Sequence, residues 1–134
     1  MDFEVLPHTA DLRIRAWGKT KEELFLNALR GMSSVMGEAA VGQPSTVERS
    51  IKLAAPDTAA LLIDFLSEAL SQSHLNREVY TDVAFAELSE KSLQATLVGV
   101  PVPEFEKDIK AVTYHGVEIK ETDQGYEATV IYDI

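Results

Sequence analysis

The sequence contains no cysteine among its 134 residues. This absence excludes disulfide bonds, thiolate metal sites and cysteine nucleophiles, and it is typical of a reducing compartment, so we expect the cytoplasm. No apolar run approaches the roughly 20 residues that a membrane-spanning helix needs. The opening Met1-Asp2-Phe3-Glu4 shows no basic segment followed by an apolar leader. We therefore expect neither a signal peptide nor a membrane anchor.

Basic residues are also scarce. The chain has 12 Lys and Arg against 22 Asp and Glu, which gives a formal net charge of −10. Proteins hold nucleic acids largely through basic side chains that neutralise phosphates, so we expect no direct nucleic-acid binding. An acidic surface suits divalent cations, a basic protein partner, or solubility alone.

The common catalytic motifs are missing as well. There is no Gly-x-Ser-x-Gly elbow, no Walker sequence and no glycine-rich turn from strand to helix. The three histidines, His8, His74 and His115, form no short-range pair, so the sequence does not support a zinc site. We interpret His74 as a structural hydrogen-bonding residue. The sequence contains no catalytic machinery that we can assemble.

Two helices are predicted by their caps and apolar stripes. Thr20-Lys21-Glu22-Glu23 has the form of a capping box, and an apolar stripe with helical spacing runs from there to a stop at Gly37. Pro56-Asp57 begins a second helix with the same kind of stripe. Each helix follows a strand, so the chain contains a weak repeat of two similar strand–helix units.

The remaining pattern is that of strands. Apolar alternation predicts strands at residues 3–5, 12–16, 47–55, 79–86, 93–98, 109–119 and 126–132, with a loop at 39–45, a break at 99–103 and a hairpin turn at 123–125. We expect a single domain, residues 1–134. It should have an α+β fold with a largely antiparallel sheet of about six to seven strands and both helices packed on one face.

Oxygen ligands are concentrated near the two ends of the sequence. Asp11 lies in a turn between the first two strands, and Asp133 is followed by the main-chain carboxylate of Ile134. Together they would suit a hard cation such as Ca²⁺ or Mg²⁺. The alternative is that Asp11 caps a turn and Asp133 faces solvent at the end of a strand. Spacing alone favours this alternative, because nothing local shows that the two ends meet.

Two further groups are ambiguous. In the run from Lys110 to His115, strand alternation would put Lys110, Val112 and Tyr114 on one face. A lysine on a strand usually only solvates an edge. Asp64 and Glu68 lie four residues apart on the second helix and could accept hydrogen bonds near a site or simply carry surface charge.

Several of these segments resemble the archease family, and the resemblance covers nearly the whole chain. The segments are His8-Thr9-Ala10-Asp11, Ala16 to Thr20 with its Glu-Glu-Leu-Phe continuation, Asp57 with residues 61–68, Ile109 to His115, and the ending Tyr-Asp-Ile.

Archeases are small α+β proteins that act as cofactors of the RtcB RNA ligase, which joins tRNA halves and repairs broken RNA. The resemblance implies an activator that promotes ligase guanylylation and multiple turnover, and not an enzyme. It implies a metal site at Asp11, Asp133 and Ile134, with Ca²⁺ expected and Mg²⁺ or Mn²⁺ as alternatives. Lys110, with His8 and His115, would serve activation and contact with the ligase.

The chain departs from the family pattern at two places. Val100 stands where an acidic residue is expected, and residues 101–108 lack the usual histidine. Two other functions remain open. One is a chaperone-like modulator of RNA-modifying enzymes such as tRNA methyltransferases. The other is a metal-dependent hydrolase that uses His8 or His115 as acid or base.

Overall fold

The structure is a computed structural model that describes residues 2–6 and 10–134. Within these residues the elements are, in chain order, β1 (Phe3–Leu6), β2 (Leu12–Gly18), α1 (Lys21–Met36), the 3-10 helix η1 (Glu38–Ala40), β3 (Val47–Ala54), α2 (Thr58–Asn76), β4 (Glu78–Leu88), β5 (Ser92–Pro101), β6 (Ala111–Val112), β7 (Ile119–Thr122) and β8 (Gly125–Asp133). The predicted α+β class is confirmed.

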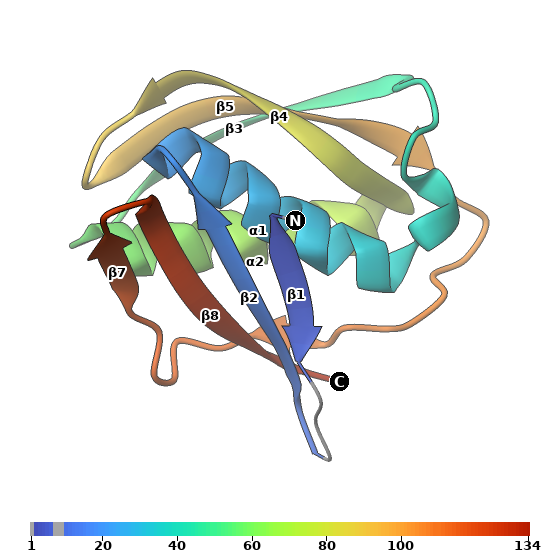
Figure 1. The fold of residues 1–134 in the computed structure, drawn as a ribbon. Coiled ribbons are helices and arrows are strands. Elements are labelled where there is room, and N and C mark those ends of the chain that lie inside the picture. The colour runs from blue at the N-terminus through green and yellow to red at the C-terminus, as the bar shows by residue number, and fades with distance from the viewer. Residues whose placement is uncertain (1, 7–9) are drawn as a thin grey trace.

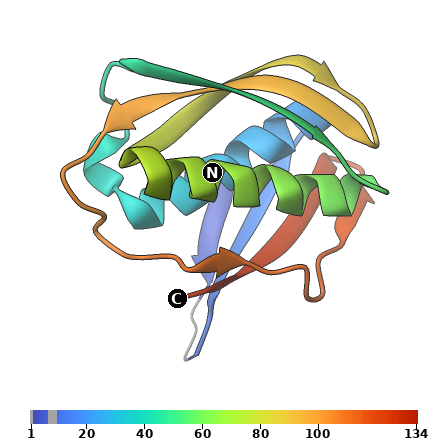
Figure 2. The ribbon, with the colours of Figure 1, turned by 180° about the vertical axis from the view of Figure 1, so that it is seen from behind.

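The strands form two antiparallel sheets, and the helices lie between them (Figures 1 and 2). One sheet has the order β1-β2-β8-β6, with β7 also pairing with β8, and the other has the order β3-β5-β4. The antiparallel pairing was predicted correctly. The prediction of a single sheet with both helices on one face was wrong. The strands of the two strand–helix units, β2 and β3, belong to different sheets.

The position between two sheets explains why the helices bury more than one apolar stripe. On α1 the buried set includes Asn27, Gly31 and Ser33 besides the predicted apolar residues. On α2 it includes Ile63 and Ser73. A helix covered by a single sheet would leave such positions in solvent. On α1 the polar side chains are satisfied internally: the Asn27 side-chain amide donates to the Trp17 carbonyl at 2.7 Å, and the Ser33 hydroxyl donates to the Tyr80 carbonyl.

Both helices begin where their capping residues predict, and α1 also ends where predicted. The Thr20 hydroxyl accepts from the Glu23 amide at 3.1 Å, and the Asp57 carboxylate accepts from the Ala60 amide at 2.8 Å. Caps of this kind stabilise a helix by about 1 kcal/mol each. Gly37 ends α1, and its amide donates to the Ser33 carbonyl at 2.9 Å.

The structure departs from the predicted pattern in three places. The segment 109–119 is not one strand, because Ala111–Val112 pairs with β8 and pairing resumes only at Ile119. Beyond it the chain turns at Gly116, whose φ of 66° suits glycine, and β7 begins at Ile119. The break predicted at 99–103 begins later, since β5 continues to Pro101. The loop predicted at 39–45 begins with η1. The hairpin turn at 123–125 is confirmed.

The core lies in the helix layer, between the two sheets. Phe25 of α1, Phe65 of α2 and Phe85 of β4 meet there, with ring centroids 5.5 to 6.2 Å apart. Aromatic contacts of this kind tie the two helices to the three-stranded sheet. Within the described part of the chain, neither helix combines the length and apolar character that crossing a membrane requires.

Candidate functional site

The end of β8 lies between β2 and β6 and brings distant parts of the sequence together. The β2–β8 register ends with Leu12 opposite Tyr132. Continued by one residue on each strand, the same antiparallel register puts Asp11 opposite Asp133. On the other side of β8, Ala111 pairs with Asp133. The C-terminal end of the chain accordingly lies beside the segment that carries β6 (Figures 1 and 2).

The main chain around Lys110 binds this strand end. The Lys110 amide donates to the Asp133 carbonyl at 2.7 Å, and the Thr113 amide donates to the Ile131 carbonyl at 2.9 Å. The Lys110 side chain is exposed. Four of the predicted site residues therefore share one strand end: Asp11, Lys110, Asp133 and Ile134.

Of the two predicted site histidines, His115 is not part of this cluster. His115 is exposed on the turn that leads to Gly116, several residues further along β8 from Asp133. His8 lies outside the described residues. A role for His115 beside the carboxylates would therefore need contact through a partner and not through this strand end alone.

The Asp11 carboxylate already has a basic neighbour. The Arg13 guanidinium donates to it from Nε at 3.2 Å and from Nη2 at 3.5 Å. Both side chains are well exposed, at 33% for Asp11 and 50% for Arg13. An ion pair in solvent is weak, commonly below about 1 kcal/mol. Asp11 can therefore exchange this neighbour for another cation at little cost.

The donor set at the strand end fits a hard cation in its chemistry. Among the described residues, no three His, Cys, Asp or Glu side chains are grouped to hold a metal ion. The predicted set has only two carboxylate side chains, Asp11 and Asp133, and its third donor is the main-chain carboxylate of Ile134. All are oxygen donors, which suit Ca²⁺ or Mg²⁺, with carbonyls and water completing the shell.

Tyr114 anchors the loop after β6 to α2. Its hydroxyl donates to the Asp64 carboxylate, although 57% of Tyr114 is exposed. This hydrogen bond, together with partial burial, raises the pKa of Tyr114. Asp64 is thus an acceptor, while Glu68 accepts from Gln72 at 3.1 Å. Val112 and Tyr114 were predicted to share one strand face, but Val112 is buried and Tyr114 is exposed. Strand alternation does not extend to Tyr114, because β6 ends at Val112.

A small hollow of about 200 Å³ separates α2 from β6 near Lys110. It is lined by Ser67, Leu70, Ser71, His74, Lys110, Ala111 and Val112. His74 Nε2 lies 3.3 Å from an Asp108 carboxylate oxygen, and its ring meets the Phe105 ring edge-on at 5.6 Å. These neighbours agree with a structural role for His74, although its position beside Lys110 was not predicted.

A buried ion pair in the second sheet was also missed. Glu78 is only 4% exposed and accepts from Arg49 Nε and Nη2 at 2.9 and 2.8 Å and from the Tyr80 hydroxyl at 2.7 Å. The hydrogen bond from Arg49 lowers the pKa of Glu78, whereas burial raises the pKa of Tyr80 to about 12. Arg49 and Glu78 lie on β3 and β4, which β5 separates, so no sequence spacing signals the pair.

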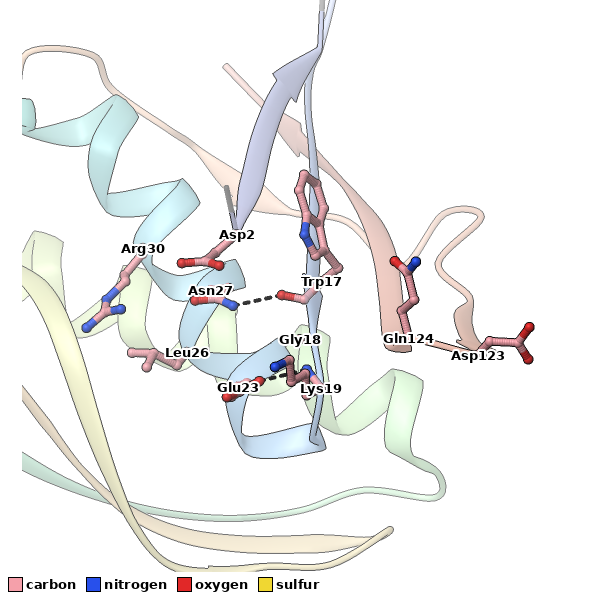
Figure 3. Close-up of a pocket in the computed structure, with 10 residues that line it drawn as sticks. All are labelled: Asp2, Trp17, Gly18, Lys19, Glu23, Leu26, Asn27, Arg30, Asp123 and Gln124. Carbon is pink, nitrogen blue, oxygen red and sulfur yellow. Dashed lines mark hydrogen bonds between the residues drawn. The ribbon is translucent and has the colours of Figure 1, made fainter.

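A larger hollow of about 740 Å³ lies beside α1 at the end of β2 (Figure 3). Acidic Asp2 and Glu23 line it together with basic Lys19 and Arg30. The Glu23 carboxylate is already bound by the Lys19 amide at 2.7 Å. This mixture of charges selects no ligand of one sign, and Asp11, Lys110 and Asp133 do not line the hollow.

Comparison with known proteins gives consistent matches along the chain. The model of the archease protein family (MTH1598/TM1083) matches residues 3–134. The protein archease of Methanosarcina mazei is 37% identical over 140 residues, with 98% of this chain and 95% of that protein covered. The corresponding protein of Methanosarcina barkeri is 35% identical with the same coverage.

Solved structures show the same architecture. Protein 1598 of Methanobacterium thermoautotrophicum superposes with a TM-score of 0.80 at 31% identity, covering 98% of each chain. An archease from Thermotoga maritima, described as a possible chaperone, superposes with a TM-score of 0.65 at 20% identity, covering 98% of this chain and 96% of that one. The second likeness is one of fold alone.

Proposed function

The chain belongs to the archease family, and from that premise we propose that it is a protein cofactor of an RtcB-type RNA ligase. In this role it promotes guanylylation and repeated turnover of the ligase in tRNA splicing and RNA repair. The ligase performs the chemistry and holds the RNA, which agrees with the formal net charge of −10 on this chain. We place this activity in the cytoplasm.

The observation that carries the proposal is the strand end where Asp11, Asp133 and Lys110 meet. The sequence separates Asp11 from Asp133 by almost the full chain, and pairing of β2, β8 and β6 brings them to one edge. Exposed charged groups gathered at the end of a paired strand are accessible to a partner while their main chain stays rigid. This combination suits a group that must enter another protein's site.

A divalent cation is part of the proposal. Asp11, Asp133 and the main-chain carboxylate of Ile134 would hold it, with Ca²⁺ favoured and Mg²⁺ or Mn²⁺ as alternatives. When bound, the cation supplies positive charge that neutralises the neighbouring carboxylates. Lys110 lies beside them with an exposed ammonium group, and we assign it, with His8 and His115, to contact with the ligase.

One of the two departures from the family pattern has a local structural reason. Val100 is 9% exposed and pairs with Val79 inside the second sheet. An isolated carboxylate at this depth would be costly, so an apolar residue suits this chain. Val100 lies in a different sheet from the Asp11–Asp133 strand end, so the proposed cation site does not depend on it.

The test is ligase guanylylation, measured as transfer of labelled GMP from GTP to a purified RtcB-type ligase. Wild-type protein is expected to raise the rate and to permit several ligations per ligase molecule. Asp11→Ala is expected to abolish the stimulation. Extension of the chain beyond Ile134 should do the same, because the main-chain carboxylate is then replaced by an amide.

The matched control is Asp123→Ala, which removes an exposed carboxylate from the turn before β8. It should stimulate as wild type does. Circular dichroism of each variant checks that the fold is retained. Normal stimulation by both Asp11→Ala and the extended chain would overturn the proposal.

The second candidate is a chaperone-like modulator of RNA-modifying enzymes such as tRNA methyltransferases. Its support is the Thermotoga maritima protein of the same fold, which is described as a possible chaperone. Affinity capture with this chain separates the two functions. Recovery of a methyltransferase without any RNA ligase would favour the chaperone-like modulator over the ligase cofactor.

A further inference from the structure

The outer edge of β3 differs from the other sheet edges of the molecule. In the three-stranded sheet, β3 and β4 are the outer strands (Figure 2). β4 has two register irregularities, between Tyr80 and Asp82 and between Phe85 and Glu87, whereas β3 pairs with β5 in regular register over all eight residues. In the other sheet the outer strands β1, β6 and β7 have four, two and four residues. Bulges and short length are two of the features that protect an edge from further pairing, and β3 has neither. Its protection consists of charged side chains alone, Glu48 and Lys52 on the exposed face and Arg49 on the inner face.

The register shows which groups this edge presents. The Ala55 amide donates to the Lys91 carbonyl at 2.8 Å, directly after the last pair of the β3–β5 register. Bonding alternates along an antiparallel pair. Ile51 and its alternate neighbours therefore bond to β5, whereas the amides and carbonyls of Glu48, Ser50 and Lys52 point away from it. Within the described part of the chain no strand pairs with that side of β3.

The side chains along this edge are complementary in charge to those of a second, antiparallel copy of β3. Glu48, Ser50 and Lys52 are all exposed and occupy alternate positions on one face. If a second copy of β3 pairs antiparallel with Ser50 on the twofold axis, Glu48 of each copy lies opposite Lys52 of the other. Opposite charges directly across a strand pair stabilise it. This register also pairs the residues whose amides are free.

The inner face agrees with the same register. Val47 of one copy would lie opposite Leu53 of the other, and both are only half-buried in the single chain. Arg49 would lie opposite Ile51, and its guanidinium remains bound to Glu78. The pairing therefore covers apolar surface without leaving a buried charge unpaired.

We propose that two copies of this protein associate through their β3 edges, antiparallel and in register about Ser50, into one continuous sheet of six strands. The interface is isologous, as expected for a twofold dimer. The formal charge of −10 on each copy opposes association at low salt. At an ionic strength of about 0.15 M the screening length is about 8 Å, which weakens this general repulsion more than the contact pairs.

Sedimentation equilibrium of the full chain from micromolar to millimolar concentration tests the proposal. The wild type is expected to reach twice the monomer mass. Glu48→Lys puts two lysines opposite each other at both ends of the interface, so the mass should stay that of a monomer, and Lys52→Glu should act likewise. The double variant Glu48→Lys/Lys52→Glu restores opposite charges and should restore the dimer. Glu121→Lys, an equal change of charge on exposed β7, should behave as wild type.

Ser50→Pro is an independent test. The amide that it removes has no hydrogen-bond partner among the residues that the structure describes, and proline is tolerated at such edge positions. It is expected to be monomeric with wild-type circular dichroism, while Ser50→Ala dimerises. If the proline variant does not fold, the masses of the Glu48→Lys, Lys52→Glu and double variants test the proposal by themselves.

Hydrogen exchange gives the residue-level result. Amides of Glu48, Ser50 and Lys52 should gain protection as concentration rises, while those of Arg49 and Ile51 are protected throughout. A wild type that stays monomeric at every concentration, or whose β3 edge pairs only with another protein, would overturn the proposal. A dimer that survives both single charge changes would overturn it as well.

Discussion

Two polar clusters in this molecule have opposite environments. At the end of β8, Asp11, Asp133 and Lys110 are accessible to solvent, and the Asp11 carboxylate forms a weak, solvent-accessible ion pair with Arg13. In the second sheet, Glu78 is buried and accepts hydrogen bonds from Arg49 and Tyr80. The first cluster leaves acceptor capacity for an external cation, while the second satisfies its charges internally.

The difference shows how charged residues divide between structure and function here. A buried charge that loses its partner is strongly destabilising, whereas an exposed pair contributes little. The Glu78 cluster should therefore determine stability and be indifferent to added ions. The Asp11 cluster should contribute little to stability and respond to a cation.

The largest effect is expected at Glu78. Glu78→Ala should lower the free energy of unfolding by about 3 kcal/mol, the lower end for breaking a buried ion pair, because the Arg49 side chain is 39% exposed. Urea unfolding at neutral pH measures it. Glu104→Ala removes an exposed carboxylate and should stay within about 0.5 kcal/mol of wild type. Equal stability of both variants would contradict the structural role of Glu78.

The pH dependence of stability follows from the same pair. Arg49 lowers the pKa of Glu78 below its ordinary value of 4.5 in the folded protein. The stabilisation is therefore present above about pH 4.5 and is lost as the pH falls through the lower, folded pKa. The stability difference between wild type and Glu78→Ala should accordingly shrink in acid.

A smaller effect is expected at the exposed cluster. With Ca²⁺ at a hundred times its dissociation constant, the free energy of unfolding of wild type should rise by about 2.7 kcal/mol. Asp11→Asn should lose this gain while changing the metal-free stability by less than about 0.5 kcal/mol. Asp123→Asn should keep the full gain. Equal stabilisation of wild type and Asp11→Asn by Ca²⁺ would show that Asp11 is not a ligand.

The smallest effect is expected where Tyr114 anchors the loop beside the exposed cluster. Asp64→Asn removes the negative acceptor of the Tyr114 hydroxyl, so the pKa of Tyr114 should fall back towards its ordinary value of 10. Ultraviolet titration of the phenolate measures it. Because the folded pKa is raised, this contact stabilises the protein below about pH 10 and the contribution is lost above that pH. An unchanged Tyr114 titration would contradict the anchor.

Much of the local structure could be predicted because its causes are local. Thr20 and Asp57 cap helices through contacts three residues away, and the hairpin turn before β8 depends on residues 123–125. The strand predicted at 109–119 was wrong because its structure depends on distant contacts. Its alternation is that of a strand, but pairing with β8 stops after Val112, and Tyr114 instead reaches Asp64 on α2.

By itself, the sequence determined the two helices with their starts and the end of α1, most of the strands, the α+β class and the identity of the residues that carry the family resemblance. These features arise from caps, periodicity and residue types, which act over a few positions. Only the tertiary structure decided that there are two sheets with the helices between them, that Arg49 meets Glu78, and that Asp11 lies beside Asp133. Those outcomes depend on which strands pair over long separations, and apolar alternation is the same whichever neighbour a strand chooses.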